Sequence, residues 1–202
     1  MKHRYIVAIT GASGVIYGIR LIRALIESHC RVIAVISDAG YQVLCHETEY
    51  QINQPFKDYI KSYLKSQNTA FSDDFALEVY PESDTAAGPA SGSYVHSGMA
   101  IAPCSMKTLA SISCGIGNNL IARAADVSLK ERRPLILLPR ETPLSMIHLE
   151  NMTRACRAGA LILPPSPSFY TCPDTIDQLA DTVVARVLDH LGIPHSLVPR
   201  WK

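Results

Sequence analysis

The residues with the clearest chemical potential follow a short apolar segment late in the chain. Residues 135–138 read Leu-Ile-Leu-Leu between Pro134 and Pro139, which is typical of a short, fully buried strand. Arg140 and Glu141 come directly afterwards. Because ligand sites of open α/β sheets lie outside the carboxyl ends of the strands, this pair predicts an anion site with an acid or base beside it. An ordinary surface ion pair after a core strand would give the same sequence.

A glycine-containing turn follows the first apolar segment. Residues 10–14 read Thr-Gly-Ala-Ser-Gly, and a helix-like segment with Gly18 comes next. Glycines let the backbone approach an anion closely, and a helix N-terminus supplies free N–H groups. The turn lacks the G-x-G-x-x-G spacing, although Asp38 lies where a ribose-binding acid would, which keeps a nicotinamide cofactor as an alternative. Ser13 and Ser37, at two adjacent strand ends, favour a mononucleotide, and a plain tight turn is the reading without a ligand.

A second polar turn, residues 103–108 (Pro-Cys-Ser-Met-Lys-Thr), also follows a strand-like segment and opens a helix. Ser105, Lys107 and Thr108 carry donors that suit a ligand, although Ser105 would serve equally as a plain N-cap. Cys104 has the chemistry of a nucleophile, but the sequence marks no base for it.

Several cations late in the chain suit a phosphate group. They are Arg123, Lys130, Arg140 and Arg186, accompanied by Tyr170 in a proline-rich loop. Guanidinium, ammonium and phenol groups together are what a phosphate site needs. Each alone is typical of a solvated surface side chain, and Lys130 would also end a helix favourably.

Alternating strands and helices must position these residues. Apolar, β-rich segments predict strands at 5–9, 31–36, 75–80, 98–102, 135–138 and 160–163. Amphipathic segments predict helices at 15–28, 39–50, 55–66, 106–113, 119–131 and 145–158, and a last helix capped by Asp174 that ends near Leu191. This alternation predicts right-handed βαβ units and therefore an α/β fold with a doubly wound parallel sheet.

No linker or repeat divides the chain, so we expect a single α/β domain over residues 1–202 with a tail at about 193–202. The tail holds Trp201, which would pack on a neighbouring subunit, over a site, or on the protein's own core. A formal net charge of +1 gives no footprint for nucleic acid or a membrane surface. No apolar segment is long enough to span a bilayer, and the first residues lack a signal-peptide layout, so we expect a cytoplasmic protein.

The spacing of cysteines and histidines matches no metal motif, so no metal is expected. Most of the six cysteines are expected to be small, buried apolar residues.

Seven motifs, taken together, are more specific than any one of them. They are Thr10–Gly14, Pro103–Leu109, Arg123–Val127, Leu129–Leu135, Pro139–Leu144, His148–Met152 and Pro199–Trp201. This set resembles the UbiX-type flavin prenyltransferases nearly from end to end, and least between about residues 52 and 88.

The resemblance implies an FMN-binding, Rossmann-like (flavodoxin-like) fold in a homo-oligomer, typically a dodecamer. It implies metal-independent transfer of a dimethylallyl group from dimethylallyl phosphate to N5 and C6 of reduced FMN, which closes a fourth ring. The product, prenylated FMN, would then serve a UbiD-type decarboxylase, in ubiquinone biosynthesis or in phenolic acid breakdown.

The resemblance also implies roles for individual residues. The FMN-binding positions correspond to Gly11, Ala12, Ser13, Ser37, Ser105, Met106, Lys107, Thr108 and Arg140. The positions that hold the phosphate of dimethylallyl phosphate correspond to Lys130, Arg140, Tyr170 and Arg186. The catalytic positions, which handle the leaving phosphate and a proton, correspond to Ser13, Glu47 and Glu141. The residue types suit these roles, because fixed cations stabilise a departing phosphate and a nearby carboxylate can move a proton.

Two other functions suit a flavin-binding chain. An FMN-dependent decarboxylase of the phosphopantothenoylcysteine type has a similar fold but lacks the Lys130 and 139–141 set, so that set argues against it. A non-catalytic flavin carrier would be favoured by loss of Lys130, Glu141 or Arg186, and all three are present.

Overall fold

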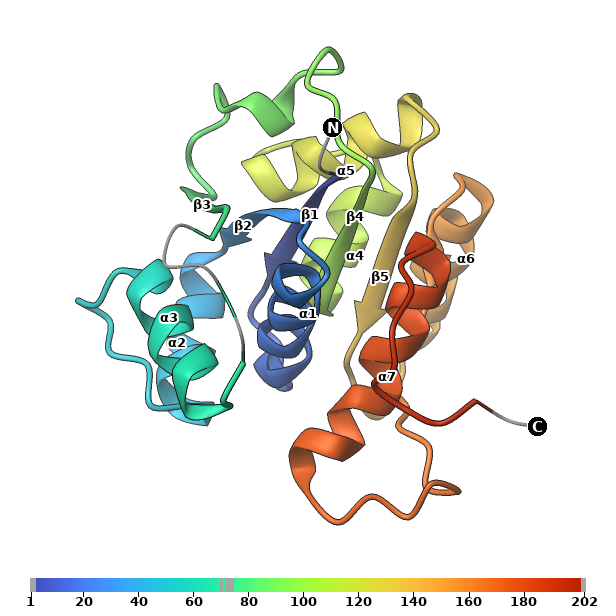
Figure 1. Cartoon of the computed structure of the whole chain (residues 1–202). Coiled ribbons are helices and arrows are strands. Elements are labelled where there is room, and N and C mark those ends of the chain that lie inside the picture. Colours follow the sequence, from blue (N-terminus) through green and yellow to red (C-terminus); the bar gives the residue numbers. More distant parts are fainter. Residues whose placement is uncertain (1–2, 70, 72–74, 201–202) are drawn as a thin grey trace.

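A six-stranded parallel sheet forms the centre of the computed structural model, which describes residues 3–69, 71 and 75–200. The strands are β1 (Arg4–Ile9), β2 (Arg31–Ile36), β3 (Leu77–Pro81), β4 (Gly98–Cys104), β5 (Leu135–Pro139) and β6 (Leu161–Ile162). Their order is β3-β2-β1-β4-β5-β6, so the connections run outward in opposite directions from the β1–β4 pair. The predicted α/β class and doubly wound, Rossmann-like (flavodoxin-like) sheet are therefore confirmed (Figure 1).

Helices cover both faces of the sheet (Figure 1). One layer contains α1 (Val15–Glu27), α2 (Asp38–Glu47), α3 (Phe56–Ser66) and α7 (Ile176–Leu191). The other contains α4 (Met106–Ser113), α5 (Leu120–Lys130) and α6 (Met146–Arg157). Both layers are apolar where they meet the strands, so the sheet is buried on both sides, as parallel sheets generally are.

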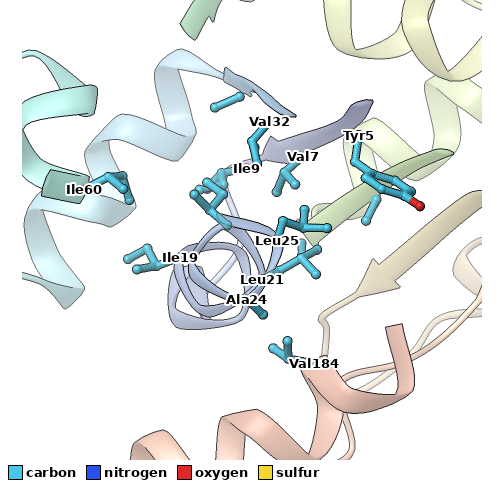
Figure 2. Close-up of a cluster of buried hydrophobic side chains, with 14 of the residues drawn as sticks. Tyr5, Val7, Ile9, Ile19, Leu21, Ala24, Leu25, Val32, Ile60 and Val184 are labelled. Atoms are coloured by element: carbon cyan, nitrogen blue, oxygen red, sulfur yellow. The ribbon is translucent and has the colours of Figure 1, made fainter. Parts of the chain in front are cut away.

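Alternation along β1 divides its side chains between the two layers. Val7 and Ile9 belong to the apolar cluster under α1, whereas Ile6 and Ala8 belong to the cluster under α4 and α5. Figure 2 shows the first cluster, in which Leu25 of α1 lies close to Val7. This packing fixes α1, and with it the turn that joins β1 to α1.

A buried ion-pair network holds α7 against α1 and α3. Arg20 is 5% exposed, and its Nε and Nη2 atoms each lie 2.5 Å from a carboxylate oxygen of Asp181. Its Nη1 atom lies 2.7 Å from Asp177 and donates to the hydroxyl of Tyr63 at 3.1 Å. A buried guanidinium needs this many partners to offset its desolvation. The network also fixes the start of α7, and so one end of the 163–175 loop that carries Tyr170.

The polar stretch after α2 folds as predicted, since the expected helix at 55–66 and strand at 75–80 correspond to α3 and β3. The predicted cap of the last helix was wrong by one residue. Thr175 is the N-cap, and its hydroxyl accepts the Gln178 N–H at 3.1 Å, whereas the Asp174 N–H donates to the Gln178 side chain at 2.7 Å.

The expectation that most cysteines are buried was also wrong. Only Cys104 is buried, while Cys114, Cys156 and Cys172 are exposed on loops and helix surfaces. Trp201 lies outside the described residues. Within the described part of the chain, every helix is too short or too polar to cross a bilayer.

Candidate active site at the carboxyl edge of the sheet

The carboxyl ends of β1 and β4 are joined by the side chain of Thr10. This residue is 1% exposed, and its hydroxyl donates to the Pro103 carbonyl at 2.8 Å while accepting the Ser105 N–H at 2.8 Å. The Thr10 N–H also points at the Pro103 carbonyl, at 3.2 Å. These bonds hold the two sequence-predicted turns side by side at the point where the strand order reverses, which is where open α/β sheets bind ligands.

The first turn packs so closely on α2 that it requires glycine. A Cβ atom at Gly11 would lie 2.5 Å from the Cβ of Ala39, and Gly14 has a φ of 100°, which L side chains rarely adopt. The turn therefore keeps a bare backbone at positions 11 and 14 and presents the exposed Ser13 between them. Ala12 is half-buried in the same turn.

Two of the helices that begin at this edge already hold a carboxylate at their N-termini. Glu47 accepts the Gly14 N–H at 2.8 Å and the Val15 N–H at 3.0 Å, at the start of α1. Glu82 accepts the Asp38 N–H at 2.8 Å, at the start of α2, and its other oxygen lies 2.5 Å from the amide nitrogen of Asn119. Anions are stabilised at such positions by the free N–H groups and the helix dipole.

The N-terminus of α4 differs from these two. Ser105 caps it by accepting the Thr108 N–H at 3.3 Å, and the two hydroxyls lie 3.0 Å apart. Among the described residues, no acceptor faces the N–H groups of Met106 and Lys107. This helix end is therefore the one best able to receive an external anion.

The residues that leave β5 arrive beside α4. The Arg140 N–H donates to the Cys104 carbonyl at 3.2 Å, which places the exposed Arg140 and Glu141 side chains at the carboxyl edge next to Ser105. Burial raises the pKa of the Tyr17 phenol, and the nearby Arg140 guanidinium offsets part of that rise. The Arg140 guanidinium thus lies near Tyr17 of α1 as well as beside α4.

These groups suit the phosphate and the polar ring edges of FMN. Ser37, 8% exposed at the start of α2, uses a lone pair to accept the Gly40 N–H at 2.9 Å, so its hydroxyl proton remains available to a ligand. With the α4 amides and the Arg140 guanidinium, it gives this edge of the sheet several hydrogen-bond donors. The described residues contain no group of histidines, cysteines and carboxylates that could hold a metal ion.

The predicted phosphate-binding residues do not all meet within one chain. Tyr170 lies in the loop after β6, on the side of Arg140. Lys130 ends α5 before β5 begins, and it pairs with Glu131. Because β5 has five residues of about 3.3 Å each, Lys130 and Arg140 lie at opposite edges of the sheet.

Arg186 also lies toward the amino edge. It pairs with Asp189 at 2.9 Å. Leu191, the last residue of α7, follows five residues after Arg186. The Leu191 carbonyl accepts the hydroxyl of Tyr5, which stands near the start of β1. The structure therefore brings Arg140, Glu141, Ser13, Ser37 and the 105–108 segment together, and leaves Lys130 and Arg186 on the far side.

Cys104 does not act as a nucleophile in this environment. Its side chain is completely buried in the cluster under α4, and burial raises the pKa of the thiol to about 12. The reactive thiolate is therefore not formed near neutral pH.

Three residues of the site were not predicted from the sequence. Thr10 was noted only as part of a turn, although a polar residue directly after a buried strand was the available signal. Glu82 follows β3 in the same way, but its partner Asp38 is 44 residues distant. Tyr17 stands three residues after Gly14 and so lies above the turn, as helical spacing allows.

Comparisons with known proteins agree with this geometry. A family model described as flavoprotein matches residues 1–188. The flavin prenyltransferase UbiX of Pseudomonas aeruginosa is 45% identical over 199 residues, which cover 98% of this chain and 93% of that protein.

Solved structures give the same result. The crystal structure of AnUbiX (PadA1) in complex with FMN and dimethylallyl pyrophosphate has a TM-score of 0.88 and 39% identity, covering 100% of this chain and 98% of that one. A dodecameric, FMN-dependent UbiX-like decarboxylase from Escherichia coli O157:H7 has a TM-score of 0.85 and 40% identity, covering 98% and 99%.

Replacing Thr10 tests whether its hydroxyl holds the two turns together. Thr10→Val keeps the shape but leaves the Ser105 N–H buried without an acceptor, so we expect a loss of about 2 kcal/mol in the free energy of unfolding. Urea denaturation of the purified protein measures this change. Thr10→Ser retains the hydroxyl and should lose clearly less, whereas equal losses in both variants would mean that the hydroxyl contributes little.

Proposed function

The chain belongs to the UbiX-type flavin prenyltransferases of the flavoprotein family, and on that premise we propose that it transfers a dimethylallyl group from dimethylallyl phosphate to N5 and C6 of reduced FMN. The observation that carries this proposal is the exit of β5. Arg140 and Glu141 stand beside the open end of α4, so a cation, a carboxylate and free amides meet where the strand order reverses.

Reduced FMN, when bound, supplies the electron-rich ring atoms at which the new carbon bonds form. We assign its binding to Gly11, Ala12, Ser13, Ser37, the 105–108 segment and Arg140. The turn at Gly11 and Gly14 presents bare backbone, and the Ser37 hydroxyl and the α4 amides are the donors that would meet the ligand. The same donors would hold a diphosphate or a monophosphate donor equally, and the related AnUbiX complex contains the pyrophosphate.

The chain's own charged groups then carry the transfer. Charge develops on the phosphate as its bond to the allylic carbon breaks, and the Arg140 guanidinium stabilises that charge best when water is excluded. Glu141 is exposed in the single chain, and we assign its carboxylate the role of taking or returning a proton at the flavin edge. Ser13 lies in the facing turn and can donate to the leaving phosphate. Glu47, which accepts the Gly14 N–H at the start of α1, keeps a second carboxylate beside the first turn.

Lys130 and Arg186 join this site from neighbouring copies of the chain. Both lie on the amino side of the sheet, across β5 and along α7 from Arg140, so they cannot reach the same phosphate within one chain. Assembly of several copies, such as the dodecamer of the E. coli relative, would supply them in trans. Both side chains are exposed, which leaves them available for this role.

The product would then pass to a partner enzyme. Prenylated FMN is a modified cofactor rather than a metabolic end point, so we propose that a UbiD-type decarboxylase in the cytoplasm receives it.

A mass measurement tests the function directly. We expect the protein, incubated anaerobically with reduced FMN and dimethylallyl phosphate, to yield a flavin heavier by one prenyl group in the mass spectrum. Unmodified FMN after long incubation would leave a flavin carrier or a decarboxylase of the cysteine type as the function.

The proton-transfer role of Glu141 is tested by Glu141→Gln. The amide keeps the size of the side chain but cannot exchange a proton, so prenylation should slow about 100-fold while FMN binding stays near normal. Asp58→Asn, which makes the same carboxylate-to-amide change at an exposed position in the first turn of α3, is the matched control. Equal rates in the two variants would remove Glu141 from the chemistry.

The role of neighbouring copies is tested by mixing two inactive variants. Lys130→Ala and Glu141→Gln should each be slow alone, but co-expressed and co-assembled chains should regain about a quarter of the intact sites by random mixing, because each site takes the two residues from different chains. Separately assembled oligomers mixed afterwards are the control. No recovery on co-assembly would show that Lys130 acts within its own chain or not at all.

A further inference from the structure

A cavity lies at the amino edge of the sheet, opposite the carboxyl edge that carries the proposed active site. It has a volume of about 780 Å³, and its lining includes His3, Arg4, Arg31 and His96. These residues stand where β1 and β2 begin and just before β4 begins, so several adjacent strands contribute to it. None of them belongs to the prenyl-transfer site, which lies beyond the other ends of the same strands.

Two arginines are placed side by side in this cavity. Arg4 and Arg31 are register partners at the first position of β1 and β2, so their side chains leave the same face of the sheet. Like charges directly opposite each other are destabilising unless an anion lies between them. Within the described residues, Arg31 has one carboxylate partner, Glu78, at 3.7 Å. Arg4 donates to the Val95 carbonyl at 3.3 Å and stacks over the Tyr94 ring at 4.6 Å, but it has no carboxylate partner there. One distant carboxylate leaves the pair under-compensated.

Two residues that line this cavity carry buried nitrogen atoms without hydrogen-bond partners. Among the described residues, neither ring nitrogen of His96 has a hydrogen-bond partner, and neither has the Nε of Arg4. His96 is only 4% exposed. Burial, helped by the nearby Arg133 guanidinium, lowers the pKa of His96 to about 4, so the ring is neutral at pH 7 and offers one N–H donor. Buried polar groups left unpaired are rare in folded proteins and call for a ligand or an ordered water.

We propose that this cavity is an anion site for a phosphate group, held by Arg4, Arg31 and His96. A phosphate oxygen between the two guanidinium groups would relieve their repulsion by charge-assisted hydrogen bonds. A second oxygen would accept the His96 N–H. The same chemistry fits free phosphate and a phosphomonoester, and none of the cavity's residues is among those assigned to prenyl transfer.

Calorimetric titration with inorganic phosphate tests the proposal, with methyl phosphate as a second arm. The assembled protein carries Arg140→Ala so that the carboxyl edge contributes little to the signal. Adding Arg31→Gln should weaken phosphate binding at least tenfold, because one of the two guanidinium groups is lost. Arg157→Gln, which removes an exposed cation on α6, is the matched control and should leave binding unchanged.

Either ligand bound in an Arg31-dependent way supports the site, and the tighter one identifies its source. Equal affinities in the Arg31→Gln and Arg157→Gln proteins would overturn it. A crystal of the unmodified protein soaked in tungstate provides a measurement that needs no variant, and we expect anomalous density between Arg4 and Arg31. An empty cavity there would also overturn the proposal. Arg31→Gln on its own should retain prenyl transfer, which separates this site from the proposed function.

Discussion

The hydrogen bonds of Thr10 are the interaction on which the ligand edge depends. A parallel sheet wound outward from β1 and β4 leaves two turns that diverge, because each turn feeds a helix on a different face. The Thr10 hydroxyl bridges the Pro103 carbonyl and the Ser105 N–H across that divergence. This bridge holds the two turns together. It thereby determines how α4 is capped, how Arg140 approaches Cys104 and how far apart the two turns lie.

Internal carboxylates then decide which helix end stays open. Glu47 and Glu82 occupy the N-termini of α1 and α2, where an anionic ligand would otherwise bind. Their presence leaves α4 as the free end and concentrates the ligand's negative charge beside Arg140. Two acidic residues thus determine which helix N-terminus remains available to an anion. The net charge of +1 gives no hint of this local arrangement of charge.

The sequence predicted what is local and missed what is distant. The order of strands and helices, including α3 and β3 in the polar stretch, follows from periodicity, because amphipathic spacing acts within a few residues. Arg140 and Glu141 were placed correctly because strand ends share an edge. The Glu82–Asp38 contact depends on how separate segments come together in space. Asp174 was mistaken for a cap because Thr175, the next residue, has equally suitable chemistry.

The position of β5 between Lys130 and Arg140 also has a consequence for the timing of activity in a cell. On the proposal that Lys130 and Arg186 act from neighbouring chains, a newly made chain would hold only part of the cation set, so a monomer would neither retain an allylic phosphate well nor activate it. Catalytic capacity would then rise with more than the first power of chain concentration, as assembly fills each site. A modest change in expression near the assembly threshold would switch cofactor supply more sharply than the same change in an enzyme whose site is complete in one chain.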